Sequence, residues 1–119
     1  MKKVKARLIV RKGNENIALK AQDIALFYRD NTVIIAVDKE EKEYLCENTT
    51  LTTLENELDE EEFFRATRKY LINIEYVKGF RNYEKVKLEI FLHLNSPKHH
   101  IIISQENAPR FKRWLSDPE

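Results

Sequence analysis

Three cationic side chains lie within five consecutive positions in the stretch from residue 63 to residue 73, where aromatic residues flank them. They are Arg65, Arg68 and Lys69. An arginine guanidinium can donate two parallel hydrogen bonds to guanine or to a phosphate, whereas a lysine ammonium acts as a point charge. The stretch therefore has the chemistry of a polyanion contact. The alternative interpretation is a solvated basic edge that balances the acidic run 59–62 just before it.

Other side chains that could support catalysis or metal binding are few. Soft metal ligands are limited to Cys46 and three histidines, His93, His99 and His100. His99 and His100 are adjacent, so in a strand they would point to opposite faces. Cys46 alternates with Tyr44 in an apolar run, which predicts a buried, unreactive thiol. The sequence has no glycine-rich phosphate loop. We therefore expect no enzyme activity, no metal, no other cofactor and no small-molecule substrate.

The composition is that of one folded domain. The chain has 119 residues, of which 34% are charged and 42% hydrophobic, and this size suits a single domain. We expect that domain to span residues 1–119, with its core at about 6–116. The net charge of +1 hides an asymmetry, because residues 1–62 carry ten basic and fourteen acidic side chains, whereas residues 63–119 carry eleven and six. The second half can therefore offer a basic face to a polyanion.

The sequence predicts a cytoplasmic location. No apolar run approaches the roughly 20 residues that span a bilayer. The basic start at residues 1–5 is not followed by the apolar stretch of a secretory signal. A single cysteine also excludes an internal disulfide.

The dominant hydrophobic period is two, which predicts short antiparallel strands. Val86, Leu88, Ile90 and Leu92 share one face of a half-buried strand. Similar short runs occur near residues 8–10, 17–19, 33–37, 44–46 and 101–103, at hairpin-like intervals. None of these runs is joined to the next by the long helical crossover that parallel strands need.

Two segments switch to helical spacing. Leu51, Leu54 and Leu58 predict a short central helix, capped by Thr52 together with Glu55 or by one of the two threonines before Thr52. A second helix is predicted near the C-terminus, where Phe111, Trp114 and Leu115 share an apolar face. Its expected cap is Asn107, and Pro109 fits its first turn. Together these patterns predict a mainly β fold of seven to ten short strands with two helices.

The stretch 63–73 resembles the signature of LytTR-type DNA-binding domains, which runs roughly Phe-x-Arg-x-His-Arg-Ser-Tyr-x-Val-Asn. The matching residues are Phe63, Arg65, Arg68, Tyr70 and Asn73. Three flanking motifs follow in the order of that family: an apolar and aromatic strand at 23–28, a threonine-leucine helix at 50–58, and a serine before a terminal helix at 103–115. The resemblance covers about residues 6–116.

This resemblance implies elongated antiparallel sheets with a small central helix and a C-terminal helix, and loops that enter successive major grooves of double-stranded DNA. It implies sequence-specific binding to promoter repeats by a bacterial response regulator of a two-component system. The partners implied are the DNA, a second copy on that DNA, and a receiver or membrane sensor domain that precedes such a domain in one polypeptide.

The resemblance also assigns roles by position. The residues expected to read bases are Asn31, Arg68, Gln105 and Asn107, and those expected to bind phosphates are Arg29, Lys69 and Lys98. Arg68 suits guanine and Asn31 suits adenine, although Asn31 is equally typical of a turn after Asp30. Arg65 either contacts DNA or braces the signature by pairing with an acidic neighbour such as Glu62.

The sequence departs from the family pattern at four positions. Thr67 replaces the usual histidine and Lys69 the usual serine, while Gln105 stands where arginine is frequent and Glu106 adds a carboxylate beside it. The preferred DNA sequence therefore cannot be carried over from relatives.

The alternative function is a protein-interaction module that uses the same β scaffold without binding DNA. Its aromatic interaction surface would include Tyr70, Tyr76, Phe80 and Tyr83. The two functions differ in their response to salt, because several phosphate contacts make binding weaken steeply as salt rises.

Overall fold

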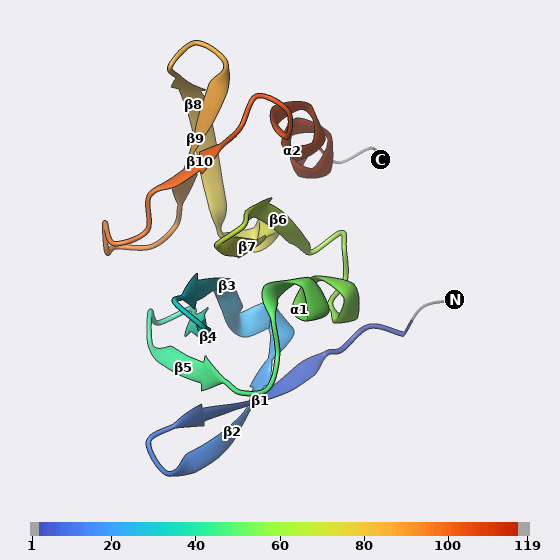
Figure 1. Ribbon diagram of the computed structural model, residues 1–119, viewed down its shortest axis with the longest axis vertical. Helices are drawn as coiled ribbons and strands as arrows, with labels where there is room; N and C mark the ends of the chain where they lie inside the picture. The colour runs from blue at the N-terminus through green and yellow to red at the C-terminus, as the bar shows by residue number, and fades with distance from the viewer. Residues whose placement is uncertain (1–2, 117–119) are drawn as a thin grey trace.

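The computed structural model describes residues 3–116, and within them the chain forms ten strands and two α-helices (Figure 1). The strands are β1 (Arg7–Lys12), β2 (Glu15–Lys20), β3 (Ile24–Asp30), β4 (Val33–Asp38), β5 (Glu43–Cys46), β6 (Phe63–Thr67), β7 (Tyr70–Asn73), β8 (Val77–Tyr83), β9 (Lys87–Leu92) and β10 (Ile101–Ile103). The helices are α1 (Leu51–Glu57) and α2 (Ala108–Leu115), and two 3-10 turns cover Ala21–Asp23 and Ile74–Tyr76. The mainly β fold with two helices is confirmed. The ends of the predicted domain, 1–2 and 117–119, lie outside the described residues.

The strands form two antiparallel sheets along an elongated body. The larger sheet has seven strands in the order β2-β1-β5-β4-β3-β7-β6, and the smaller has the order β10-β9-β8. The β1–β2 hairpin lies at one end of the long axis and the β8–β9 hairpin at the other (Figure 1). The principal extents are 45 × 36 × 24 Å.

Strand β3 lies between two hydrophobic cores. Ile24 and Phe27 belong to the first core, with α1 and the β1–β2 hairpin. Leu26 and Tyr28 belong to the second, which packs beneath α2 and the three-stranded sheet. This double burial explains the continuous apolar run of β3, which lacks the alternation of a strand with one wet face.

A β-bulge shifts the faces within β3. The register with β4 changes between Ile24 and Leu26, so Ile24 shares a core with Phe27 instead of with Leu26. A bulge inserts one extra residue into a strand and moves all following side chains to the other face. A strict period of two cannot predict this switch.

Helix α1 packs Leu51, Leu54 and the following Leu58 into the first core, where each is at most 2% exposed, as the spacing predicted. Its N-cap is Thr50, whose side-chain oxygen accepts from the backbone N–H of Thr53 at 3.1 Å. Of the alternatives left open by the sequence, the structure therefore selects Thr50 and not a Thr52–Glu55 capping box.

Helix α2 buries Phe111 completely and has Pro109 in its first turn, as expected. Asn107 occupies the N-cap position, as predicted, but its side chain does not cap the helix. Asn107 has helical backbone angles and makes no capping hydrogen bond with its side chain. The backbone N–H groups of Asn107 and Ala108 instead donate to the carbonyl oxygen of Ser104, at 3.1 and 3.0 Å. The turn before α2 thus begins three residues earlier, at Ser104.

Strand β9 places Leu88 and Ile90 in the second core, as predicted, but Glu89 between them is buried as well. Leu88 and Ile90 are buried, but Val86 precedes the strand and is 47% exposed, so its predicted place on the buried face was wrong. On the opposite face the Glu89 carboxylate accepts from Arg81 Nε at 2.7 Å and lies 2.7 Å from His100 Nε2. The hydrogen bond from Arg81 lowers the pKa of Glu89. Burial opposes this effect, and the bond to His100 adds to it.

Asn73 is a fully buried polar residue at the end of β7. Its Nδ2 donates to the carbonyl oxygen of Ile24 at 2.8 Å, and its Oδ1 accepts from the backbone N–H of Glu75 at 2.9 Å. These bonds link β7 to the start of β3.

We predict that Asn73→Ala lowers the free energy of unfolding by about 1–3 kcal/mol, because it removes the buried bond to the Ile24 carbonyl and the part-buried bond from the Glu75 N–H. Urea denaturation followed by circular dichroism measures the change. The exposed Asn56→Ala in α1 is the matched control and should change it by less than about 0.5 kcal/mol. Equal stabilities of the two variants would contradict the prediction.

Candidate nucleic-acid interface

Two hairpin turns that are distant in sequence lie side by side. Tyr28 of β3 pairs with Tyr70 of β7, and the backbone N–H of Arg29 donates to the carbonyl oxygen of Lys69 at 3.0 Å. The β3–β4 turn carries Asn31, and the β6–β7 turn carries Arg68. The structure thus brings together four of the residues for which the sequence predicted DNA contacts: Arg29, Asn31, Arg68 and Lys69.

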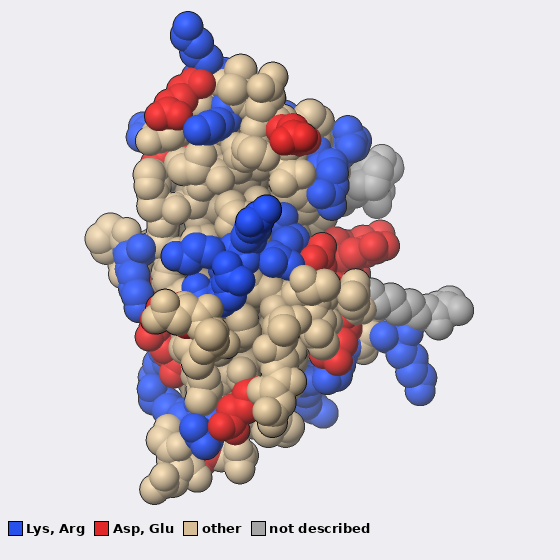
Figure 2. Space-filling model, in the orientation of Figure 1, with Lys and Arg blue, Asp and Glu red and all other residues tan. Residues whose placement is uncertain are grey.

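The side chains on these two turns face solvent and carry unpaired charge. Arg29, Arg68 and Lys69 are exposed, and within residues 3–116 their side chains make no hydrogen bond or ion pair. Figure 2 shows Lys and Arg side chains gathered at the centre of one face, over β6 and β7. This face can therefore present several free cations to a polyanion.

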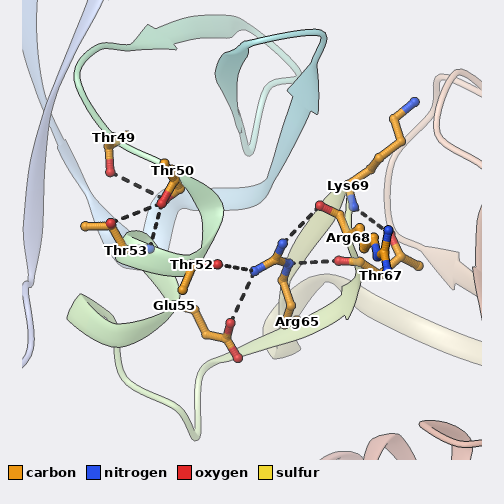
Figure 3. Close-up of polar contacts among 9 residues, drawn as sticks. All are labelled: Thr49, Thr50, Thr52, Thr53, Glu55, Arg65, Thr67, Arg68 and Lys69. Atoms are coloured by element: carbon orange, nitrogen blue, oxygen red, sulfur yellow. Dashed lines mark hydrogen bonds and ion pairs between the residues drawn. The ribbon is translucent and has the colours of Figure 1, made fainter.

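Arg65 lies between α1 and the β6–β7 turn and braces that turn from within (Figure 3). Its Nε donates to the carbonyl oxygen of Thr67 at 2.8 Å, and its Nη2 to that of Arg68 at 3.0 Å. Its Nη1 reaches Thr52 Oγ1 and Glu55 Oε1, each at 3.3 Å. All three guanidinium nitrogens are therefore engaged, and the geometry favours bracing over DNA contact.

The acidic partner of Arg65 is Glu55, not the Glu62 that the sequence suggested. Glu55 lies on the face of α1 that meets β6. Burial, with Asp59 and Glu75 nearby, raises the pKa of Glu62 above its ordinary value. The pairing depends on how α1 packs against β6, which nearness in sequence does not reveal.

A hollow of about 270 Å³ opens between these turns and the start of α1. Its lining residues are Arg29, Asn31, Thr32, Ile34, Thr49, Thr50, Leu51, Thr52, Arg65 and Arg68. Three arginines line it, and no carboxylate does. The threonines were not among the predicted site residues, because those at 49, 50 and 52 suit the start of a helix and Thr32 suits a turn.

Asn31 has a structural role at the tip of its turn. Its backbone φ is +56°, in the left-handed region that asparagine tolerates better than most residues. Both interpretations of Asn31 thus fit the structure, because its backbone makes the turn and its exposed amide extends from it.

The third predicted segment stands apart from the first two. Gln105 and Asn107 lie in the turn between β10 and α2, beyond β6 and β7 along the long axis (Figure 1). Gln105 is exposed, whereas Asn107 Oδ1 accepts from Arg110 Nη1 at 3.4 Å. Because bidentate adenine reading uses both the oxygen and the nitrogen of the amide, Gln105 is the freer of the two.

Lys98 is held in an ion pair within the protein. Its Nζ donates to Glu43 Oε2 at 2.7 Å and to the Tyr28 hydroxyl at 3.1 Å. The bond to Glu43 raises the pKa of Lys98 and correspondingly lowers the pKa of Glu43. A DNA phosphate would have to compete with Glu43 for this ammonium.

The remaining signature residues point inward. Phe63 is in the first core and Asn73 is fully buried. The Tyr70 hydroxyl lies 3.0 Å from Nδ1 of His99, whose ring also packs against Tyr28 at 4.7 Å between centroids. Burial lowers the pKa of His99, and nearby Lys98 adds to that effect. Of the five residues that match the signature, Arg68 is the one on the exposed surface.

The aromatic residues predicted for a protein-interaction face pack against separate parts of the fold. Phe80 contacts Phe111 at 5.6 Å between centroids, whereas Tyr83 contacts His100 at 6.1 Å. Tyr70 packs near Tyr28 and His99. These contacts do not favour one continuous aromatic surface.

Other candidate chemistry is weak in the described part of the chain. Burial raises the pKa of the Cys46 thiol to about 12, as expected for an unreactive cysteine. Between residues 3 and 116, no three side chains of His, Cys, Asp or Glu lie close enough to hold one metal ion. In the same range, no helix has the length and apolarity needed to cross a membrane.

Comparisons with known proteins agree with this geometry. The family model of the LytTr DNA-binding domain matches residues 14–116. The chain is 28% identical over 110 residues to the transcriptional regulatory protein NatR of Bacillus subtilis strain 168; the match covers 91% of this chain and 45% of NatR. The chain therefore spans less than half of that relative. A solved LytTr DNA-binding domain from Bacillus cereus has the same fold, with a TM-score of 0.80 at 14% identity, over 95% of this chain and 99% of that domain.

We predict that Arg65→Lys loosens the β6–β7 turn and lowers the free energy of unfolding by about 1–3 kcal/mol, because an ammonium cannot hold both turn carbonyls and Glu55 together. Hydrogen exchange read by mass spectrometry should become faster at residues 67–69. Arg113→Lys, at an exposed arginine of α2, is the control. Unchanged exchange at the turn in Arg65→Lys would show that the brace is dispensable.

Proposed function

The chain belongs to the LytTr DNA-binding domain family, and from this premise we propose that it binds double-stranded DNA sequence-specifically, through the major groove, as part of a bacterial transcription regulator. The observation that carries the proposal is the junction of the β3–β4 and β6–β7 turns. There, a 3.0 Å backbone hydrogen bond between Arg29 and Lys69 fixes two exposed cationic tips next to each other.

The chemistry of the two tips divides into base reading and backbone contact. Arg68 extends from a turn that Arg65 braces, so its guanidinium can donate two bonds to guanine O6 and N7. Asn31 can pair with adenine from the neighbouring turn. Arg29 and Lys69 supply positive charge for phosphates, which set the position of the protein on the duplex.

The dimensions of the domain support contact with more than one groove. Its longest extent is 45 Å, whereas successive major grooves on one face of B-DNA are about 34 Å apart. The turn between β10 and α2, which carries Gln105, lies away from β6 and β7 along this axis (Figure 1). We place Gln105 in the groove next to the one that Arg68 reads, with Asn107 as a secondary contact.

The wider biological role is also part of this proposal. NatR is named as a transcriptional regulatory protein, and the present chain matches less than half of it. A receiver or sensor domain in the same polypeptide and a second copy bound to a neighbouring promoter repeat are partners that suit a regulator of this kind. The chain would do this work in the cytoplasm without catalysing a reaction.

We predict that Arg68→Ala weakens binding to the preferred duplex by roughly 1–3 kcal/mol and leaves random DNA nearly unaffected, whereas Lys69→Ala weakens binding to both alike. Duplexes selected from a random pool supply the preferred site, and fluorescence anisotropy at several salt concentrations measures affinity. Lys69→Ala should also reduce the log–log salt slope by about 0.9.

The same experiment separates the proposal from a protein-interaction module. Failure of the selection to enrich any sequence with the wild-type chain would refute sequence-specific binding. Enrichment that persists unchanged in Arg68→Ala would refute base reading by Arg68 alone.

We predict that Asn31→Gly changes the preference at one base position while it keeps the fold. Glycine adopts a positive φ without strain, so this variant removes the amide and spares the turn, which Asn31→Ala would strain. Selection repeated with Asn31→Gly should show one relaxed position in the consensus, with thermal unfolding as the check on folding. An identical consensus would assign Asn31 to the turn only.

A further inference from the structure

The hollow beside Arg29 and Arg68 differs in charge from other hollows on the molecule. Three larger ones in the described part of the chain each include at least one carboxylate, from Glu89, from Asp59 and Glu62, or from Glu55 and Glu60. The hollow of about 270 Å³ has three arginines and four threonines along its wall, and no carboxylate. Arg65 pairs with Glu55, which lies outside this lining, but Arg29 and Arg68 have no ion pair within the described residues. Two neighbouring guanidinium groups without a counter-charge repel each other, and an anion relieves that repulsion.

We propose that this hollow is a seat for one phosphate group of the DNA backbone, held by Arg29, Thr32 and Thr52. The inference rests on the proposed function and adds two threonine hydroxyls as contacts. It also separates the work of two arginines. Arg29 holds the phosphate within the hollow, and Arg68 at its rim reads the base.

Thr52 is poised to donate a hydrogen bond. Its Oγ1 accepts from Arg65 Nη1 at 3.3 Å, and within the described residues its hydroxyl proton has no acceptor. The hydroxyl of Thr50 is instead used by the helix cap and by Thr53 Oγ1 at 3.0 Å. A hydroxyl that accepts from a guanidinium becomes a stronger donor, because linked hydrogen bonds polarise one another. Because its oxygen accepts from Arg65, the Thr52 hydroxyl would form a stronger hydrogen bond to the phosphate.

The floor of the hollow strengthens these contacts. Ile34 and Leu51 line it and are 3% and 2% exposed. Charges that meet over an apolar floor interact more strongly than charges surrounded by water. An arginine–phosphate contact can also be bidentate, which adds geometric selectivity for the phosphate group.

The test combines Thr52→Val with single neutral methylphosphonate substitutions along the selected duplex. We expect Thr52→Val to raise the Kd about 10- to 150-fold, the range of one hydrogen bond to a charged group. One methylphosphonate position should weaken wild-type binding strongly and Thr52→Val little, while the other positions weaken both proteins equally. Thr52→Ser, which keeps the hydroxyl, should restore affinity, and Thr53→Val is the matched control on the same helix.

The outcomes separate this inference from the function on which it rests. If Thr52→Val binds like wild type and no position couples to it, while Arg68→Ala still loses specific binding, the seat is refuted and the function stands. Loss of all duplex binding by the wild-type chain would refute both. A titration with inorganic phosphate against chloride at equal ionic strength distinguishes the source of the phosphate. The proposal that the seat holds a DNA phosphate would be overturned by one result. Free phosphate would bind saturably at Thr32 and Thr52, while every methylphosphonate position weakened wild type and Thr52→Val equally.

Discussion

The pairing of β3 with β7 is the constraint on which the proposed interface depends. These strands are more than forty residues apart in the sequence, and their contact places the turn after Arg29 beside the turn that carries Arg68. Hydrophobic cores on both faces of β3 fix the register, because a slip by one residue would exchange the side chains of the two cores. The Asn73 side chain also fixes this pairing, because it donates a hydrogen bond from the end of β7 to the start of β3. Exposed cations from two hairpins can therefore act as one surface only while this pairing holds.

Most of the signature stretch supports the turn from which one side chain, Arg68, extends. Phe63 and Asn73 are buried, and Arg65 uses its nitrogens on the carbonyls of the turn and on α1. Arg68 is left exposed at the tip. A guanidinium presented from a braced turn loses less conformational freedom on binding than one on a flexible loop. A residue that matches the signature can thus support the contact surface without being part of it, and Arg65 is such a residue.

Much of the fold could be predicted from hydrophobic spacing, because period-two runs and the leucines of α1 report burial locally. The bulge at Ile24, the pairing of Arg65 with Glu55 and the engagement of Lys98 by Glu43 could not. Each depends on which elements pack together, and spacing along the chain does not carry that information. The missing side-chain cap at Asn107 has a different cause. The backbone N–H groups of Asn107 and Ala108 donate to the Ser104 carbonyl, so a backbone turn precedes α2, and residue type alone does not reveal that turn.

A chain with a net charge of +1 can still present local positive charge, because several of its carboxylates pair with basic side chains away from the two turns. Glu43, Glu47, Glu55 and Glu57 each pair with a basic side chain inside the protein. Arg29, Arg68 and Lys69 are left without such partners in the described part of the chain. Three cations at one junction neutralise only a few phosphates, and non-specific attraction grows with the number of phosphates neutralised. On the function proposed above, affinity for the preferred site would therefore come largely from base edges at Arg68 and Asn31, together with the phosphate proposed to lie beside Arg29. A near-neutral domain that works in this way would discriminate between DNA sequences instead of binding all of them tightly.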